Sequence, residues 1–263
     1  DPKKPYALTK EEEDIMERLE RAFENCEKLQ RHMHFLLNKG GLYKVYNGNL
    51  LYHGCVPLKE DGNLKSVRIF GRAYEGKGLY EVLESYVRKG FYAMDPKEKE
   101  RGKDIMWYIW LSENSPLFGK DKMATFERYF LAEKETHKEK KNPYYLLLED
   151  EKVVGKILKE FGLENEDAHI INGHVPVKTI KGEQPMKAGG KLLVIDGGFS
   201  KAYQPETGIA GYTLVYHSHG LQLVQHDPFQ STQKAIEEGQ DIKSTTFVIE
   251  FNSQRMMVKD TDK

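Results

Sequence analysis

Hydrophobic side chains near the start of the chain recur at the spacing of one helix face. From Ile15 to Leu36 they alternate in steps of four and three residues, which is typical of an amphipathic helix. Thr9 and Glu12 form a capping-box pattern at its start, and the Gly-Gly pair at 40–41 would end it. The pattern predicts one long amphipathic helix within residues 1–41 that packs on the body of the protein; an intermolecular coiled coil is the less favoured alternative.

Strand and helix patterns alternate through the middle of the chain. Hydrophobic runs on both sides of Asn47-Gly48 predict a tight β-hairpin. An aromatic-rich run over 104–111 is expected to be buried, and the charged stretch over 95–104 to be a loop or a helix start. The other elements predicted here are a strand over 66–70 and helices over 79–89, 123–135 and 152–161.

The second half of the chain has mainly strand patterns. The predicted strands cover 170–171, 191–195, 211–217, 221–226 and 245–251. These patterns indicate an α/β (α+β) fold with a helical first half and a β-rich second half. Residues 42–263 are expected to form one compact unit with a helical insertion at about 75–165.

Composition narrows the class of protein. The 263 residues include 40 basic and 41 acidic side chains, for a formal charge of −1, so no overall field draws the chain to nucleic acid or to a membrane. No apolar run approaches the ~20 residues of a membrane span, and no signal peptide is visible. The two cysteines fit a reducing compartment. We therefore expect a cytoplasmic globular protein; its start at Asp1 leaves room for a missing N-terminal part.

Two histidines stand in similar local sequences. His53 and His174 each end an apolar, strand-like run beside a glycine, with a proline two or four positions later. Ligands of open α/β sheets bind at the carboxyl ends of strands, and imidazole is the commonest side-chain ligand of metals. We therefore expect these two histidines to bind a metal ion.

A glycine-rich run over 71–78 matches seven of the eight positions of a phosphate-binding loop. The last position should carry a Ser or Thr hydroxyl for magnesium, but it is Gly78. No hydrophobic strand ending in an aspartate follows to complete such a site. A simple turn is the favoured interpretation.

Two further histidine patterns have the spacing of metal sites. Asp167-x-His169 has the spacing of a metal-binding pair, but a solvated loop is favoured. His217 and His219 are two residues apart, with His226 further on, so two of them would share a strand face. Because no third ligand is apparent nearby, a partly exposed strand face is the favoured interpretation.

Two loops have the composition of anion sites. The strand over 191–195 leads into Asp196 and two glycines, with Lys201 close behind. This loop suits an anion and a tight turn equally well. The loop over 115–123 carries Lys120 and Lys122 before a predicted helix, which would suit a phosphate. A solvated surface loop explains it nearly as well.

Short motifs around the histidines resemble those of a known superfamily. Residues 51–57, with His53, look like the strand-His-Gly motif of the calcineurin-like metallophosphoesterases, and residues 171–174 look like their later Gly-His motif. Asp-Ile-Met-Trp at 104–107 is similar to the Asp-Leu-Leu-Trp segment of serine/threonine protein phosphatases. Residues 192–203 resemble the strand and loop that close those active sites.

Longer strings narrow the resemblance to bacterial class III fructose-1,6-bisphosphatases, over nearly the whole chain. These strings lie at 106–110, 115–127, 135–145 and 195–204. The resemblance implies hydrolysis of fructose 1,6-bisphosphate to fructose 6-phosphate and phosphate, a role in gluconeogenesis, and control by adenine nucleotides. It also implies that residues 42–263 form the C-terminal part of a metallophosphoesterase-type αββα sandwich.

One departure from the superfamily pattern is as informative as the match. Three motifs that supply the other metal ligands are absent ahead of the two histidine motifs: an early Asp-x-His, a Gly-Asp-x-x-Asp-Arg-Gly and a Gly-Asn-His-Glu. The chain therefore resembles the C-terminal portion of the enzyme, whose other ligands would lie before Asp1. Because the general-acid histidine belongs to a missing motif, no catalytic proton donor is assigned.

The resemblance also implies the chemistry of the site. Two divalent ions, expected to be Mn²⁺, would assist hydrolysis of a phosphate monoester, with His53 and His174 binding the same ion. By position alone, the expected contacts to the substrate's second phosphate are Lys120, Lys122, Lys178, Lys201 and, more weakly, Tyr203.

The expected partners are a sugar bisphosphate and the missing N-terminal part of the same enzyme. Assembly into a homo-oligomer is compatible with the resemblance, whereas nucleic acid and membranes are not expected partners. Two alternative functions stay open: a phosphatase of the protein-phosphatase type, and a folded fragment without catalytic activity.

Overall fold

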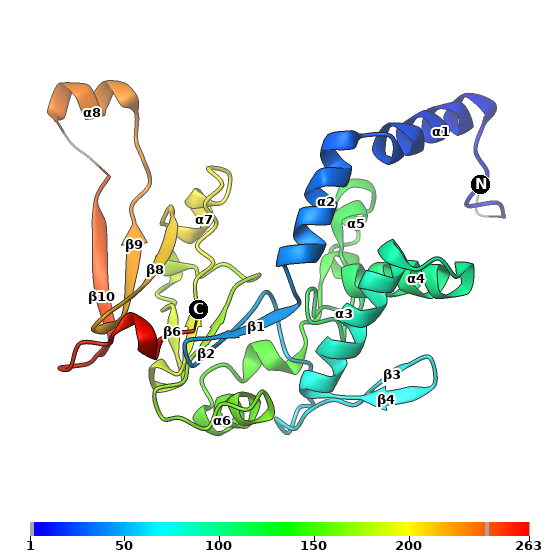
Figure 1. Cartoon of the computed structure of the whole chain (residues 1–263). Helices are drawn as coiled ribbons and strands as arrows, with labels where there is room; N and C mark the ends of the chain where they lie inside the picture. Colours follow the sequence, from blue (N-terminus) through cyan, green and yellow to red (C-terminus); the bar gives the residue numbers. More distant parts are fainter. Residues whose placement is uncertain (1–2, 240–241, 263) are drawn as a thin grey trace. The chain divides into compact units, whose positions relative to one another are not determined.

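The computed structural model describes residues 3–239 and 242–262. The chain divides into two compact units, Asp1–Gly41 and Leu42–Lys263, and each is described by itself (Figure 1). None of the described helices combines the length and hydrophobicity that a membrane span needs.

The first unit contains two helices, α1 (Lys10–Glu24) and α2 (Glu27–Lys39). The predicted capping box is confirmed, since Thr9 N donates to Glu12 Oε2 at 2.7 Å and Glu12 N to Thr9 Oγ1 at 3.3 Å. The prediction of one long helix within residues 1–41 is wrong.

The helix is interrupted between α1 and α2. The Asn25 side chain donates from Nδ2 to the Arg21 carbonyl at 2.8 Å, and Cys26 takes an extended conformation with φ −79° and ψ 97°. Asn competes with the helix for backbone hydrogen bonds. The hydrophobic period does not reveal this break because it continues into α2. Packing of the first unit on the rest of the protein stays a prediction.

A five-stranded mixed sheet with the order β1-β2-β5-β7-β6 organises the second unit. The three central strands, β2, β5 and β7, run parallel, and the two edge strands pair antiparallel to their neighbours. The hairpin predicted at Asn47-Gly48 connects the first two strands. The strand bounds are Tyr43–Tyr46, Asn49–Tyr52, Ile170–Asn172, Met186–Lys187 and Leu192–Val194 for β1, β2, β5, β6 and β7.

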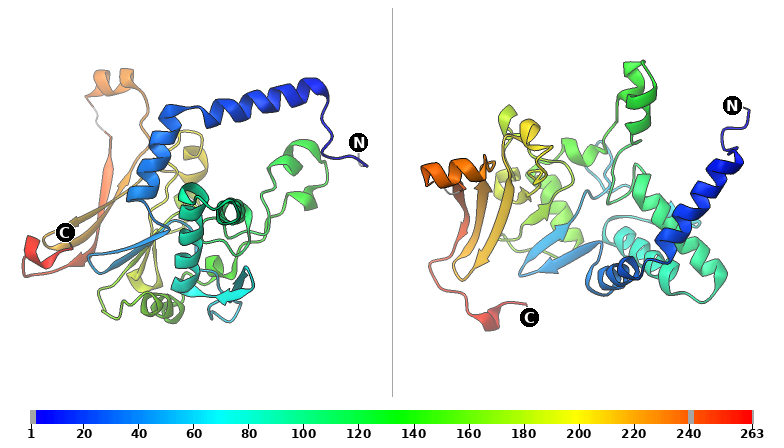
Figure 2. Two further views of the ribbon diagram at one scale, coloured as in Figure 1. Left: turned by 45° about the vertical axis from the view of Figure 1, so that its right-hand side comes forward. Right: turned by 90° about the horizontal axis from the view of Figure 1, so that it is seen from above.

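Hydrophobic rows run across the parallel strands. Leu50 pairs with Ile170, and Ile170 with Leu192, and all three side chains are fully buried. Helix α6 (Glu151–Glu160) contributes Val154 and Ile157 to the same core and lies beside the sheet (Figures 1 and 2). Continuous apolar strands are typical of parallel strands that are covered on both faces.

A helical hairpin follows the first two strands of the sheet. Helices α3 (Gly76–Tyr92) and α4 (Pro96–Leu111) lie side by side (Figure 2), next to the small hairpin of β3 (Val67–Ile69) and β4 (Arg72–Tyr74). Asp95 caps α4 through the backbone N–H groups of residues 97 and 98, so the charged stretch over 95–104 is the start of a helix.

The expectation that residues 104–111 are buried is only partly correct. Ile105 and Ile109 are buried in a second hydrophobic cluster, whereas Trp107 is 67% exposed and Trp110 64% exposed. Residues four positions apart share a helix face, and the two tryptophans point elsewhere. The prediction, which relied on the aromatic-rich composition, therefore overestimated how much of this helix is buried.

The segment after this hairpin has little regular structure. The helix predicted over 123–135 extends only over α5 (Thr125–Phe130), and Phe126, Tyr129 and Phe130 are exposed. A short helix without a buried face has little tertiary packing to lengthen it. Two 3₁₀ turns follow, Lys134–His137 and Pro143–Leu146.

The C-terminal part forms a three-stranded antiparallel sheet with the order β10-β9-β8. Tyr212 of β8 and Leu223 of β9 join the same core as Leu50 and Ile170, so the two sheets share one core. Helix α8 connects β9 to β10 (Figure 2). The bounds are Gln204–Thr207 for α7, Gly211–His217 for β8, Gly220–His226 for β9, Thr232–Glu238 for α8 and Ser244–Phe251 for β10.

The predicted α/β (α+β) class is confirmed, and every predicted strand is present with shifts of one or two residues at its ends. Three 3₁₀ turns complete the second unit: Thr179–Lys181, Ala188–Gly190 and Val258–Asp260. The expectation that this unit is part of an αββα sandwich stays a prediction.

Because Ile170 lies at the centre of the hydrophobic row, we expect Ile170→Ala to lower the free energy of unfolding by about 2–5 kcal/mol. Ile180→Ala is a matched control, because Ile180 is 66% exposed and its loss should cost about 0.5 kcal/mol or less. Urea denaturation of both variants checks this; equal losses would show that the row is not the core of the unit.

Candidate metal centre

Three segments far apart in the sequence meet at one edge of the five-stranded sheet. His53 follows β2, Gly173 and His174 follow β5, and Asp196 comes two residues after β7. Since these strands are parallel and adjacent, their carboxyl ends lie at the same edge. This is the place where α/β sheets bind ligands.

Backbone and side-chain hydrogen bonds hold these strand ends together. Gly173 N donates to the His53 carbonyl at 2.9 Å, and Ile195 N donates to the Asn172 carbonyl at 2.9 Å. The buried Asn172 side chain donates from Nδ2 to the Gly54 carbonyl at 3.0 Å and to Tyr144 Oη at 2.7 Å. The residues that flank the two histidines are therefore fixed relative to each other.

The predicted pair of histidines is brought together. His53 Nε2 lies 3.0 Å from His174 Nδ1, and the two ring centroids are 4.9 Å apart at an interplanar angle of 67°. His174 has a φ of +66°, an uncommon conformation for a residue with a side chain, and one that is concentrated at functional sites. This backbone conformation helps to direct its ring towards His53.

Both imidazoles are biased towards their neutral form. Burial lowers the pKa of His53, against the opposing effect of the Asp196 carboxylate. Burial, His53 and Lys120 together lower the pKa of His174 to about 4, although the Phe118 carbonyl and Asp196 act in the opposite direction. A neutral imidazole is the form that binds a metal.

The nitrogen separation fits two ligands of one metal ion. Two nitrogens bound at about 2.1 Å and at right angles lie roughly 3 Å apart, which agrees with the 3.0 Å between His53 and His174. His174 Nε2 is buried and makes no hydrogen bond of normal geometry with the described residues. A proton on Nε2, near the Phe118 carbonyl, would leave Nδ1 free to bind the metal.

The pair is an incomplete ligand set. Among the described residues, no group of three or more His, Cys, Asp or Glu side chains could hold a metal ion. The two imidazoles fit as part of a centre, and further ligands would have to be supplied from outside the described residues.

Asp196 lies at the same edge of the sheet. The sequence alone did not show that it is near the two histidines. Its carboxylate raises the pKa of both histidines, and Oδ1 accepts from Gly198 N at 3.0 Å. A Cβ on Gly173 would lie 3.4 Å from Asp196 Cβ, so the two strand ends approach closely. Its position directly after a buried strand was the available signal.

Some of the lysines expected to bind substrate are engaged elsewhere. Lys120 acts on His174 electrostatically, but its Nζ also forms an ion pair with Glu139 at 3.0 Å. Lys122 Nζ donates to the Thr136 carbonyl at 2.6 Å. Lys178 Nζ lies 3.7 Å from a Glu206 carboxylate oxygen. Both lysines of the loop over 115–123 are therefore bound to the segment that contains Thr136 and Glu139.

Lys201 and Tyr203 lie in the loop after β7 and are exposed. Tyr203 packs against Gly198: a Cβ added there would lie 2.8 Å from Tyr203 Cβ. Gly198 has a φ of +65°, so the loop beside Asp196 requires a glycine at this position.

The glycine-rich run over 71–78 is not the simple turn that the sequence favoured, since only Gly71 lies in a turn. It divides between strand β4 and the first residues of α3. At that helix start, Lys77 N donates to a carboxylate oxygen of Glu160 at 3.1 Å. The position that a phosphate would take is occupied by the protein's own carboxylate.

The other histidines make structural hydrogen bonds. His219 N donates to His217 Nδ1 at 3.1 Å. His226 lies between Thr213 Oγ1 at 2.8 Å and Ser244 Oγ at 2.9 Å. His169 is buried directly before β5. His217 and His226 end strands β8 and β9, whereas His219 lies in the turn between these strands, so the interpretation of a shared strand face is wrong for His219.

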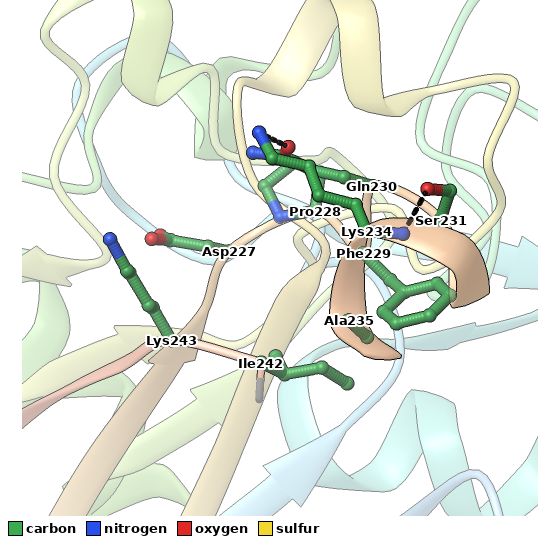
Figure 3. A pocket seen from close by; sticks show the side chains of 9 residues that line it. All are labelled: Asp227, Pro228, Phe229, Gln230, Ser231, Lys234, Ala235, Ile242 and Lys243. Atoms are coloured by element: carbon green, nitrogen blue, oxygen red, sulfur yellow. Dashed lines mark hydrogen bonds between the residues drawn. The ribbon is translucent and has the colours of Figure 1, made fainter. Parts of the chain in front are cut away.

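A cavity of about 160 Å³ lies near helix α8 (Figure 3). Lys234, Phe229 and Lys243 contribute to its walls, and Lys234 Nζ donates to the Gln230 side chain. None of the residues that line it belongs to the strand ends carrying His53, His174 and Asp196. It is a separate feature of the C-terminal sheet.

Comparison with known proteins shows the family of the chain. The sequence model of the Firmicute fructose-1,6-bisphosphatase family matches residues 1–263. Proteins named fructose-1,6-bisphosphatase class 3 are 65% identical in Bacteroides fragilis and 62% identical in Bacteroides thetaiotaomicron, each over 264 aligned residues. One from Clostridium botulinum is 57% identical over 263 residues. No solved structure matches the chain.

The matches cover 100% of this chain but only 39–40% of the relatives. The chain thus spans about 40% of the length of the curated proteins that it matches. From the family match and from these identities, the chain belongs to the Firmicute fructose-1,6-bisphosphatase family.

Proposed function

We propose that this chain supplies two imidazole ligands to the metal centre of an enzyme that hydrolyses fructose 1,6-bisphosphate to fructose 6-phosphate and phosphate. The observation that carries the proposal is the 3.0 Å approach of His53 Nε2 and His174 Nδ1 at adjacent strand ends. Membership of the family supports the substrate, since the relatives carry that name. The remaining ligands and the general acid would come from the part of the enzyme outside this chain.

His53 and His174 would hold one divalent ion through Nε2 and Nδ1. When bound, the ions would neutralise phosphoryl oxygens and lower the pKa of a water molecule. Asp196 adds negative charge beside both imidazoles, which favours a cation at this edge. The hydrogen bonds around Gly173 and Asn172 would keep the ligands in place during turnover.

Manganese as the metal, the cytoplasm as the compartment and gluconeogenesis as the pathway belong to the same proposal. Mn²⁺ accepts imidazole together with carboxylate and water ligands. Cys26 and Cys55 are both free, and free thiols are usual in the reducing cytosol. The pathway follows from the proposed substrate.

The residues that the sequence indicates as phosphate contacts of the substrate have unequal structural support. Lys120 has the strongest support, because its charge acts on His174. Lys178 follows, although it faces Glu206. Lys201 and Tyr203 flank the Asp196 loop, and Lys122 would first have to leave the Thr136 carbonyl.

In the complete enzyme, we expect His53→Ala and His174→Ala each to reduce kcat/KM by more than roughly 100-fold. Loss of a residue that only hydrogen-bonds to a metal ligand already costs roughly 10- to 100-fold, and loss of the ligand itself should cost more. Bound metal, measured by elemental analysis, should fall in parallel while the circular dichroism spectrum is kept. His32→Ala is the control, because His32 is exposed on α2. Normal activity in either site variant would contradict the ligand assignment.

For the isolated chain, we expect weak Mn²⁺ binding and no turnover. Two imidazoles alone hold a hard divalent ion poorly, since such ions prefer oxygen ligands. Calorimetry of the chain with Mn²⁺ checks this. Tight binding, or robust hydrolysis of fructose 1,6-bisphosphate by the chain alone, would show that the ligand set is larger than proposed.

The substrate assignment is tested by comparing fructose 1,6-bisphosphate with a phosphoserine peptide on the complete enzyme. We expect a higher kcat/KM for the sugar bisphosphate, because the loops near the site carry several lysines that suit a second phosphate. A preference for the phosphopeptide would instead support an enzyme of the protein-phosphatase type.

A further inference from the structure

A cavity of about 230 Å³ lies beside the loop that carries His174. Asn172, Gly173 and Val175 belong to its lining, so the cavity directly adjoins the strand end of the candidate metal centre. This space is many times the roughly 10–15 Å³ that one water molecule needs. The cavity is therefore large enough for a chemical group of a substrate whose reacting end is at the histidines.

A second part of the cavity lining comes from a distant segment of the sequence, which contains Lys141 and Tyr145. Backbone pairing fixes this segment: Lys120 and Lys141 form a β-bridge, and Asn142 N donates to the Gly119 carbonyl at 2.9 Å. The buried Asn142 side chain accepts from Leu58 N at 3.1 Å. The backbone that carries Lys141 is thus held in place before any ligand binds.

Lys141 is a cation without a counter-charge in direct contact. Its Nζ lies 5.8 Å from the centre of the Tyr145 ring and forms no ion pair with a described residue. The other lysine of the cavity, Lys187, is paired with Glu149 at 2.7 Å. Lys141 therefore differs from the lysines nominated from the sequence, several of which have protein partners.

Burial and charges of both signs act on Lys141. Burial and the charges of Lys120 and Lys178 lower the pKa of Lys141, although Glu183 and Glu139 act in the opposite direction. Glu183 lines the cavity as well, and one of its carboxylate oxygens accepts from Lys178 N at 2.9 Å. An anion bound in the cavity in contact with the Lys141 Nζ would supply the direct counter-charge that no described residue provides.

Asn172, which lines the cavity, also carries a buried acceptor. Asn172 is 3% exposed, and its Oδ1 has no hydrogen-bond partner among the described residues. A buried unpaired acceptor costs free energy unless a ligand or water donates to it. Because this oxygen is itself buried, it is an internal polar group of the strand end, and the recognition of an anion in the cavity falls to Lys141.

We propose that Lys141 and this cavity form a subsite for the phosphate group of the substrate that is not hydrolysed. The proposal rests on the proposed function, because it assumes that the other phosphate lies at the metal centre. The charge of Lys120 acts on both His174 and Lys141. Lys120 is therefore close enough to affect both the metal centre and the proposed subsite. Lys141 thus determines specificity for a bisphosphate over a simple monoester.

Kinetics of the complete enzyme test this role. We expect Lys141→Met to lower the ratio of kcat/KM for fructose 1,6-bisphosphate to kcat/KM for p-nitrophenyl phosphate by about tenfold or more, as the loss of a charge-assisted hydrogen bond implies. Lys141→Arg keeps the charge and should restore most of the ratio. Lys140→Met is the matched control, since Lys140 is the preceding residue and does not line the cavity. An unchanged ratio in Lys141→Met would overturn the proposal.

Binding to the metal-stripped complete enzyme separates this proposal from the proposed function. Without metal, calorimetry with fructose 6-phosphate measures binding that does not depend on the metal centre, and Lys141→Met should weaken it about tenfold while Lys140→Met does not. Equal affinity of the wild type and Lys141→Met would overturn the subsite. If the metal-loaded wild type instead fails to hydrolyse fructose 1,6-bisphosphate, the proposed function fails, and this binding measurement still decides the subsite.

Discussion

The parallel pairing of β2, β5 and β7 is the constraint on which the rest of the site depends. The register Leu50–Ile170–Leu192 buries one row of side chains completely. The neighbouring pair of Ile171 and Leu193 is buried as well, so both faces of β5 and β7 are covered. The same register brings the ends of the three strands to one edge, where His53, His174 and Asp196 meet.

Local sequence patterns were sufficient for elements that are determined locally. The Asn-Gly turn, the capping box at Thr9 and the apolar strands were predictable because neighbouring residues set them. The histidine pair was predictable because each residue ends such a strand. In contrast, the break after Glu24 depends on one Asn side chain, and the exposure of Trp107 depends on which face of α4 meets the core.

The remaining features of the site required long-range pairing. Asp196 was visible as the end of a strand, but only the parallel neighbours show that it lies beside both histidines. Lys141 was not nominated at all, because its place in the cavity depends on the pairing of its segment with the loop at Lys120. The lysines chosen by sequence position are in part neutralised by partners such as Glu139, which no local pattern reveals.

The central claim is that His53 and His174 bind the same metal ion. Anomalous X-ray scattering from crystals of the complete, manganese-loaded enzyme tests it most directly. The account predicts one ion with both His53 Nε2 and His174 Nδ1 at about 2.1–2.2 Å, a bond length usual for imidazole ligands. An ion bound without either nitrogen, or the two histidines on different ions, would contradict the account.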